Sequence, residues 1–180
     1  RDVLGSRGLG DVYKRQMQCD MESVYFNCIL NNPTITTVGN FAYTFKCDVT
    51  CDAPWAWEYP KSASYGPFDV EGTFTFNNIS DDNYYMLPTF TVTLSSSEDE
   101  FQLLNQTDDN KGCTFTGLSP KETLTIDSSR YLITSSTGLL RVGNMTGILP
   151  RLVPGLNKLQ VIGSVDDIKI DYQNARKVSG

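Results

Sequence analysis

The chain has 180 residues and contains five cysteines and 21 acidic residues whose side chains could carry out chemistry, but it contains no histidine. The absence of histidine excludes Ser-His-Asp and Cys-His catalysis, together with metal sites that use imidazole ligands. The sequence contains neither a GxxxxGK(S/T) phosphate loop nor a GxGxxG dinucleotide-binding loop. Thiols, paired carboxylates and lysine side chains are the chemical groups that remain.

The cysteines are odd in number and irregularly spaced, at Cys19, Cys28, Cys47, Cys51 and Cys113. This pattern favours free thiols in a reducing cytoplasm over a disulfide framework. If the segment CDVTC (47–51) is a strand, the Cα atoms of Cys47 and Cys51 lie about 13 Å apart, at roughly 3.3 Å per residue. A disulfide needs less than about 7 Å. No second cysteine pair completes a zinc site. We therefore predict buried free thiols, no metal site and no cofactor.

The carboxylates could bind calcium or act as the acid and base of a glycosidase. The segment DDNKG (108–112) resembles the opening of a calcium loop. Where such a loop requires glycine and glutamate, however, this sequence has Cys113 and Ser119. We expect a solvated turn at this position. No carboxylate lies in a recognisable cleft-forming motif, so we expect no catalytic residues and no enzymatic activity, with a two-carboxylate glycosidase as the catalytic alternative.

Most of the chain alternates apolar and polar residues with a period of two, which is typical of antiparallel strands with one buried face. In the segment 41–50 this alternation predicts an apolar face made of Phe41, Tyr43, Phe45, Cys47 and Val49. The same alternation occurs at 73–77, 89–94, 122–127, 157–163 and 168–173. Turn residues separate these runs at 108–112, 118–121, 127–129, 154–157 and 164–167. We predict an all-β protein with an antiparallel β-sandwich and only short helices.

Proline and glycine interrupt the strand pattern between residues 54 and 68, which indicates a domain boundary. We place a β remnant of an earlier domain at 17–57, a linker at 58–67 and the sandwich at 68–180. Trp55 and Trp57 flank Ala56, so their rings share one face in an extended segment. They either fill the joint between the domains, which we favour, or form a sugar-stacking or subunit-contact surface.

The first residues of the chain differ in character from the rest. Residues 6–16, SRGLGDVYKRQ, resemble the translation of a transposon-based sequencing-library adapter. Nothing in them has the apolar core of a signal peptide. We expect residues 1–16 to be unstructured and to pack against nothing, and the segment 17–54 to be poorly packed.

Charge and hydropathy exclude two classes of partner. Residues 17–180 contain 11 Lys and Arg against 19 Asp and Glu, a net charge of −8. Nucleic acid and anionic membrane surfaces both bind basic patches, so neither is expected as a partner. No apolar run approaches the roughly 18 residues of a membrane span.

Three segments resemble distal tail proteins of long-tailed phages. FAYTFKCDVTCDAPWAW (41–57) is similar to the end of that family's ring-forming domain, FTGLSPKETLTIDSSRYLITSSTG (115–138) to a hairpin of the following domain, and ILPRLVPGLNKLQVIGSVDDIKIDYQNARKV (148–178) to its closing strands. The R-L-x-P-G-x-N turn lies in the last segment. The resemblance covers nearly all of 24–178, and the order and spacing of the segments make it more specific than any one of them.

The resemblance implies a structural role in a virion. Distal tail proteins form a ring at the tail tip, assembled in the bacterial host cytoplasm, and join the tail tube to baseplate or fibre proteins. The N-terminal domain forms the ring, and the C-terminal domain is a galectin-like or carbohydrate-module-like jelly roll. The implied partners are copies of the same chain and neighbouring tail proteins. The expected interface residues are Phe41, Tyr43, Phe45, Trp55 and Trp57.

The alternative function is a secreted or virion-borne glycan-binding module. Three Asn-x-Ser/Thr sequons, at Asn78, Asn105 and Asn144, fit a secreted protein, although roughly two are expected by chance. A galectin sugar site relies on histidine, which this chain lacks. A glycan is therefore the less favoured partner, because a fold does not by itself carry a function.

Overall fold

The computed structural model describes residues 13–17, 23–39, 41–95 and 100–177. Within these the chain forms two compact units, one through Tyr59 together with the chain from Arg176 onward, and the other from Pro60 to Ala175. The predicted all-β class is confirmed: apart from two short 3-10 helices, η1 (Gln106–Asp108) and η2 (Val142–Asn144), every regular element of the described chain is a strand. No helix in these ranges is both long enough and apolar enough to cross a membrane.

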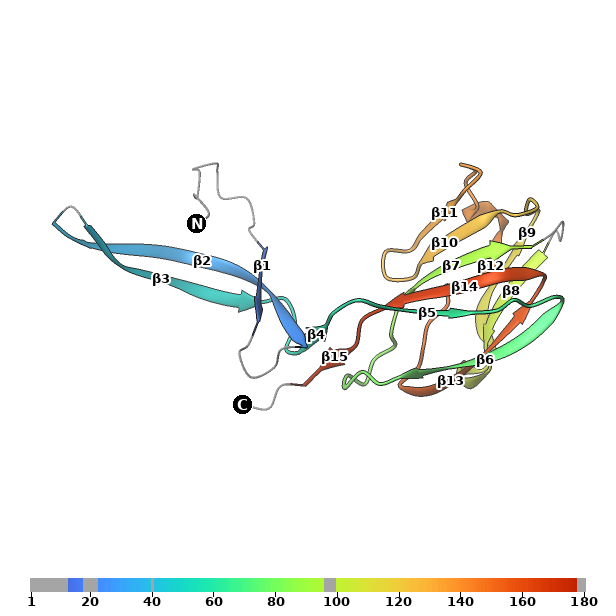
Figure 1. Ribbon diagram of the computed structural model, residues 1–180, viewed down its shortest axis with the longest axis horizontal. Coiled ribbons are helices and arrows are strands. Elements are labelled where there is room, and N and C mark those ends of the chain that lie inside the picture. The colour runs from blue at the N-terminus through green and yellow to red at the C-terminus, as the bar shows by residue number, and fades with distance from the viewer. Residues whose placement is uncertain (1–12, 18–22, 40, 96–99, 178–180) are drawn as a thin grey trace. The chain divides into compact units, whose positions relative to one another are not determined.

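The first unit is a sheet in which the strands follow the order β1-β2-β4-β15, with β3 paired to β2 (Figure 1). Its strands are β1 (Tyr13–Met17), β2 (Val24–Val38), β3 (Phe41–Cys51), β4 (Ala56–Glu58) and β15 (Ala175–Arg176). β2 and β3 form the long hairpin in blue and cyan in Figure 1. Pro33 lies at a register shift of this hairpin, between Asn31 and Thr34, as expected for a residue that cannot donate to the ladder.

Strand β1 contradicts the expectation that residues 1–16 pack against nothing. Its backbone pairs antiparallel with β2, with Tyr13 opposite Ile29 and Met17 opposite Tyr25. The physical reason is that an uncovered strand edge offers hydrogen-bonding groups to any extended segment, whatever its side chains. Residues 1–12 lie outside the described residues.

The expectation that 17–54 is poorly packed is confirmed for the outer part of the hairpin, where residues 31–37 and 48–51 are exposed. It is wrong at the base of the hairpin, where Val24, Tyr25 and Cys28 are buried. At the base β2 has partners on both edges, β1 on one side and β3 and β4 on the other, which the outer hairpin lacks in the described chain.

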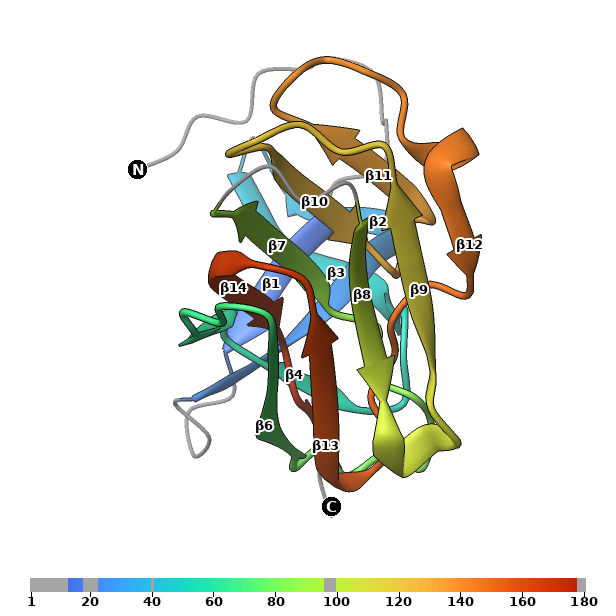
Figure 2. The ribbon, with the colours of Figure 1, turned by 90° about the vertical axis from the view of Figure 1, so that its right-hand side faces the viewer.

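The second unit is a sandwich of two five-stranded antiparallel sheets, with strand orders β11-β10-β7-β14-β5 and β12-β9-β8-β13-β6 (Figures 1 and 2). The first sheet contains β5 (Lys61–Tyr65), β7 (Thr89–Leu94), β10 (Thr123–Asp127), β11 (Leu132–Ser135) and β14 (Val165–Tyr172). The second contains β6 (Glu71–Asn78), β8 (Glu100–Asn105), β9 (Lys111–Thr116), β12 (Met145–Gly147) and β13 (Gly155–Ile162).

The core of the sandwich consists of the alternate residues that the period-two pattern predicted to face inward. In β7 these inward-facing residues are Phe90, Val92 and Leu94, and in β13 they include Leu159 and Val161. All five are nearly or fully inaccessible to solvent. At about 25 cal/mol per Å² of buried apolar surface, such side chains supply most of the stabilisation of the unit.

The expected linker 58–67 is wrong over most of its length. Residues Lys61–Tyr65 form β5 and pair with β14, with Ala63 opposite Ile170. The boundary between the units falls at Tyr59 and Pro60, and again at Ala175 and Arg176 rather than at the end of the chain. Small polar residues gave this segment the composition of a linker, but as an edge strand it needs apolar packing on one face only.

Candidate interaction surface

The β2–β3 hairpin carries an exposed apolar surface that we call the hairpin face, consisting of Leu30, Ile35, Phe45 and Val49. Ile35 lies directly opposite Phe45, and Leu30 lies opposite Val49. Residues directly opposite each other in an antiparallel pair project to the same side. Ile35 is 65% exposed, Phe45 59% and Val49 49%, so the hairpin face is an apolar surface left in water.

The other side of the hairpin is polar. The Nδ2 of Asn31 donates to the Oγ1 of Thr50 at 3.2 Å, and the Nδ2 of Asn32 donates to the Oδ2 of Asp48 at 2.8 Å. The hairpin is therefore amphipathic although both of its sides are exposed. A contiguous exposed apolar surface with a polar surround is typical of an interaction site.

The five expected interface residues lie in two segments of the chain, strand β3 and the segment 55–57. Phe45 lies in the hairpin face. Phe41 and Tyr43 belong to the same strand, β3, but their side chains lie outside what is described, and a register shift between Thr36 and Thr37 interrupts the regular pairing beside them. The alternation expected over 41–49 is therefore interrupted between Ala42 and Thr44, and it is regular within β3 from Thr44 to Val49.

Trp55 and Trp57 lie in the second of these segments. Their rings meet edge to face, with centroids 6.1 Å apart and an interplanar angle of 82°. Both side chains are half-buried, and Ala56 between them is fully buried. Two rings at right angles do not provide the flat platform on which a sugar would stack, so the geometry disfavours that interpretation. The indole N–H groups are buried without a hydrogen-bond partner among the described residues.

The prediction of buried thiols is only partly correct. Cys28 and Cys113 are buried, Cys47 is partly buried and Cys51 is exposed. Cys51 lies opposite Cys28 in the β2–β3 register, with 3.1 Å between the two sulfur atoms. Sequence reasoning compared Cys51 only with Cys47, because the contact with Cys28 depends on the long-range register of the hairpin. Cys19 lies outside the described residues.

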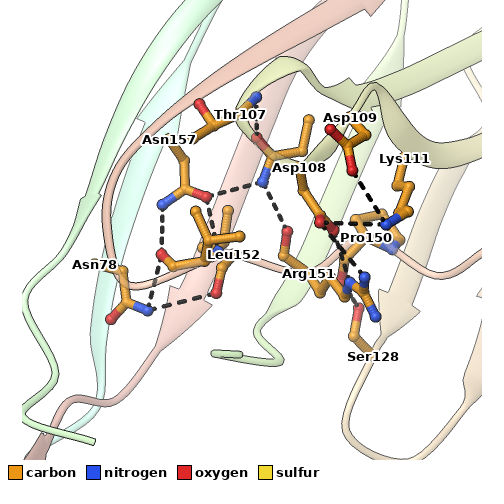
Figure 3. Close-up of polar contacts among 12 residues, drawn as sticks. Asn78, Thr107, Asp108, Asp109, Lys111, Ser128, Pro150, Arg151, Leu152 and Asn157 are labelled. Carbon is orange, nitrogen blue, oxygen red and sulfur yellow. Dashed lines mark hydrogen bonds and ion pairs between the residues drawn. The ribbon is translucent and has the colours of Figure 1, made fainter. Parts of the chain in front are cut away.

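In the sandwich, the R-L-x-P-G-x-N turn is anchored by buried amides (Figure 3). The side chain of Asn157, which is fully buried, accepts from the N–H of Val153 and donates to the carbonyl groups of Val153 and Gly155, all within 2.9 Å. Its Oδ1 also accepts from the Nδ2 of Asn105, and that amide donates to the carbonyl oxygen of Arg151. The motif thus has a structural explanation: its buried asparagine satisfies partly buried backbone groups of the turn.

Two of the three sequons are inaccessible in the folded chain. Asn78 and Asn105 are each 2% exposed, and both side chains donate hydrogen bonds to the turn. A glycan on either nitrogen would remove these bonds and would require space inside the packed protein. Only Asn144 is partly exposed. This geometry weakens the secreted, glycosylated alternative.

The expected solvated turn at 108–112 is wrong at its first residue. Asp108 is buried and pairs with Arg151, whose Nε lies 2.7 Å from Oδ2. Lys111 also lies 3.7 Å from Asp108 (Figure 3). The guanidinium of Arg151 lies 3.8 Å from the centre of the Tyr85 ring. The hydrogen bond from Arg151 holds the pKa of Asp108 below its usual range.

A second buried ion pair joins Glu122 and Arg141, which are 1% and 5% exposed. The Arg141 Nε and Nη2 atoms lie 2.7 and 2.6 Å from the two carboxylate oxygens. The Ser119 N–H and the Ser135 hydroxyl also donate to this carboxylate. Burial raises the pKa of Glu122, but these donors outweigh burial and leave it lowered. Both buried carboxylates are thus ionised and neutralised by arginine, which suits a structural role and not a proton-transfer role.

Comparison with known proteins agrees with this structural character. Residues 55–172 match a family model described as a phage tail C-terminal domain. The chain is also similar in structure to the Dit protein (gp 19.1) of phage SPP1, described as a paradigm of the hub adsorption apparatus in phages that infect Gram-positive bacteria. The TM-score is 0.64 at 11% sequence identity, and the match covers 86% of this chain and 62% of the SPP1 protein. No curated protein sequence matches the chain.

Proposed function

We propose, from the premise that the chain belongs to the family of phage tail C-terminal domains, that it acts as a distal tail protein. As a member of that family it is a structural component of a virion tail. In the proposed role it joins the tail tube to baseplate or fibre proteins through a ring of copies at the tail tip, without catalysis. Assembly takes place in the host cytoplasm before the virion is released.

The observation that carries the proposal is the hairpin face. Three of its side chains, Ile35, Phe45 and Val49, are about half exposed or more and lie along one side of a two-stranded hairpin. An isolated two-stranded hairpin is only marginally stable in water, and its uncovered edges invite further strand pairing. Contact with a neighbouring subunit or tail protein would bury this apolar surface and shield these edges.

The two units divide the role in the proposal. The unit through Tyr59 belongs to the ring-forming part and uses the hairpin face as its contact surface. The Pro60–Ala175 sandwich is the outer domain. The residues of its hydrophobic core are buried between its own two sheets, so this core does not depend on a neighbour, although other apolar side chains of the sandwich, such as Leu140, are exposed. The neutralised carboxylates Asp108 and Glu122 support the non-catalytic part of the proposal.

The test is co-expression of the full chain with the proteins encoded beside it in its source genome, read by light scattering and negative-stain electron microscopy. The expected result is a stable complex that contains several copies of the chain. In the variant Phe45→Asp the complex should be lost, because a charge would have to be buried in the contact.

The matched control is Tyr131→Asp, which changes an aromatic side chain that is 78% exposed in the sandwich. This variant should assemble like the wild type. Assembly that is unaffected by Phe45→Asp, or equally impaired by both variants, would contradict the proposed contact surface.

A further inference from the structure

The two facing cysteines at the base of the hairpin occupy a position where a disulfide can close. The N–H of Asp52 donates to the carbonyl oxygen of Asn27 at 3.0 Å, so the adjacent pair, Cys28 and Cys51, is a non-hydrogen-bonded pair of the ladder. In such pairs the Cα atoms are about 4.5 Å apart and the side chains are at their closest. This separation falls within the range that disulfides span, and the sulfur atoms already lie 3.1 Å apart.

We propose that Cys28 and Cys51 form a thiol–disulfide site that a low-molecular-weight disulfide of the glutathione type oxidises. The proposal goes beyond the assembly function and does not depend on it. Outside a reducing cytoplasm, oxidation at this site covalently joins β2 to β3.

The different exposure of the two cysteines sets the order of the reaction. Cys51 is exposed, whereas Cys28 is 3% exposed. Burial, and next the hydrogen bond with Cys51, raise the pKa of Cys28 to about 11, so Cys28 stays protonated while Cys51 reacts. The Cys51 thiolate attacks one sulfur of the oxidant RSSR, forming a mixed disulfide and releasing one RS⁻. Cys28 then loses its proton to solvent and attacks the Cys51 sulfur, which releases the second RS⁻. In total two thiols lose two electrons, and RSSR is reduced to two RSH.

Of the cysteines that the structure describes, neither Cys47 nor Cys113 is placed to compete. Cys47 lies four residues before Cys51 in the same strand, about 13 Å away at roughly 3.3 Å per residue. Cys113 is fully buried in the core of the sandwich. Closure at Cys28 and Cys51 would fix the base from which the exposed part of the hairpin extends. Side-chain hydrogen bonds across that part of the hairpin, such as the bond from Asn32 to Asp48, are themselves exposed to solvent.

The test is to incubate the reduced full chain with oxidised glutathione and then to titrate its thiols after unfolding. The count is expected to fall from the five cysteines of the sequence to three, with peptide mapping that finds Cys28 linked to Cys51. The Cys28→Ser variant should instead retain glutathione on Cys51, because the resolving thiol is gone. The variants Cys47→Ser and Cys19→Ser should form the same disulfide as the wild type.

The proposal is overturned if the wild-type chain keeps all five thiols, if its disulfide joins a different pair, or if glutathione persists on Cys51 in the wild type as it does in Cys28→Ser. The intact mass separates free thiols, an internal disulfide and bound glutathione, and peptide mapping identifies which pair is joined. Tryptophan fluorescence shows whether each serine variant is folded enough to be compared.

Discussion

The substitution Arg141→Met tests the buried ion pair of the sandwich, because it removes the arginine and leaves the Glu122 carboxylate in place. This carboxylate accepts two hydrogen bonds from Arg141, one from Ser119 and one from Ser135. Hydrogen bonds to charged groups contribute about 1.5–3 kcal/mol each, so the loss of two predicts about 3–6 kcal/mol. Measured losses for broken buried pairs, about 3–5 kcal/mol, agree with this range.

The predicted loss depends on pH with a definite sign. In the wild type the pKa of Glu122 is lowered in the folded state, so its contribution is present above the unfolded pKa and is lost as the pH falls through the folded pKa. In Arg141→Met the carboxylate loses its cation while it stays buried, and its folded pKa rises above the unfolded value. Protonation of Glu122 at low pH then removes the cost of its unpaired buried charge in the variant. The difference in stability between variant and wild type should therefore become smaller from pH 7 to pH 4.

Unfolding of the sandwich has to be followed by a probe other than tryptophan fluorescence, because both tryptophans lie in the other unit. Cys113 lies in the sandwich and provides such a probe. Cys113 is fully buried, which keeps the reagent away from its sulfur and raises the pKa of the thiol to about 12, so it reacts with a maleimide pulse only after the sandwich unfolds. Labelling of its peptide across a urea gradient gives the midpoint and the free energy of unfolding. The control Arg130→Met removes a side chain that is 79% exposed and lies 3.8 Å from Asp127, and it should change stability by less than about 0.5 kcal/mol. A loss of under about 1 kcal/mol for Arg141→Met, or a loss that does not change with pH, would refute the reasoning.

Three further predictions use the same reporters. Asn157→Ala should destabilise the sandwich by about 3 kcal/mol, because the buried amide of Asn105 and partly buried backbone groups of the turn lose a partner. A loss below about 1 kcal/mol in the Cys113 assay would contradict the anchoring role. Gly112→Ala should lower the free energy of unfolding by about 2–3 kcal/mol, since a Cβ there would collide with the carbonyl oxygen of Leu103. The control Gly143→Ala has open space around the new atom and should be nearly neutral. Equal losses of stability in the two variants would argue against the steric explanation. Phe45→Asp should change the unfolding of the first unit, followed by tryptophan fluorescence, by less than about 1 kcal/mol, because Phe45 is mostly in water; a large loss would mean that the residue stabilises the fold and is not available as a contact.

The strands of the sandwich were predictable because their signal is local. Alternation in 89–94 and 168–173 directly reports which side chains face the core, and the structure confirms both strands. The edge strand β5 was missed, since an edge strand of small polar residues has the composition of a linker. β1 was missed for a related reason: the pairing of its backbone with β2 depends on an available edge and not on its own side chains.

The features that matter most to the candidate site depend on contacts between distant residues. The apolar character of Phe45 is visible in the sequence, but its exposure is not, because it depends on whether another part of the fold covers β3. The cysteine contact spans 23 positions of the chain, and the ion pair between Glu122 and Arg141 spans 19. A wrong register of the hairpin by one residue would separate Cys28 from Cys51. The alternation alone therefore predicts that the hairpin has an apolar side, but it does not predict which thiols meet.

The central claim, that this chain is a structural protein of a phage tail tip, is tested most directly on particles of the phage that encodes it. Purified virions should contain the chain by mass spectrometry, and cryo-electron microscopy should place several copies in a ring at the tail tip, with density that fits the Pro60–Ala175 sandwich. Absence of the chain from purified virions, or its location on the capsid or along the tail shaft, would contradict the claim.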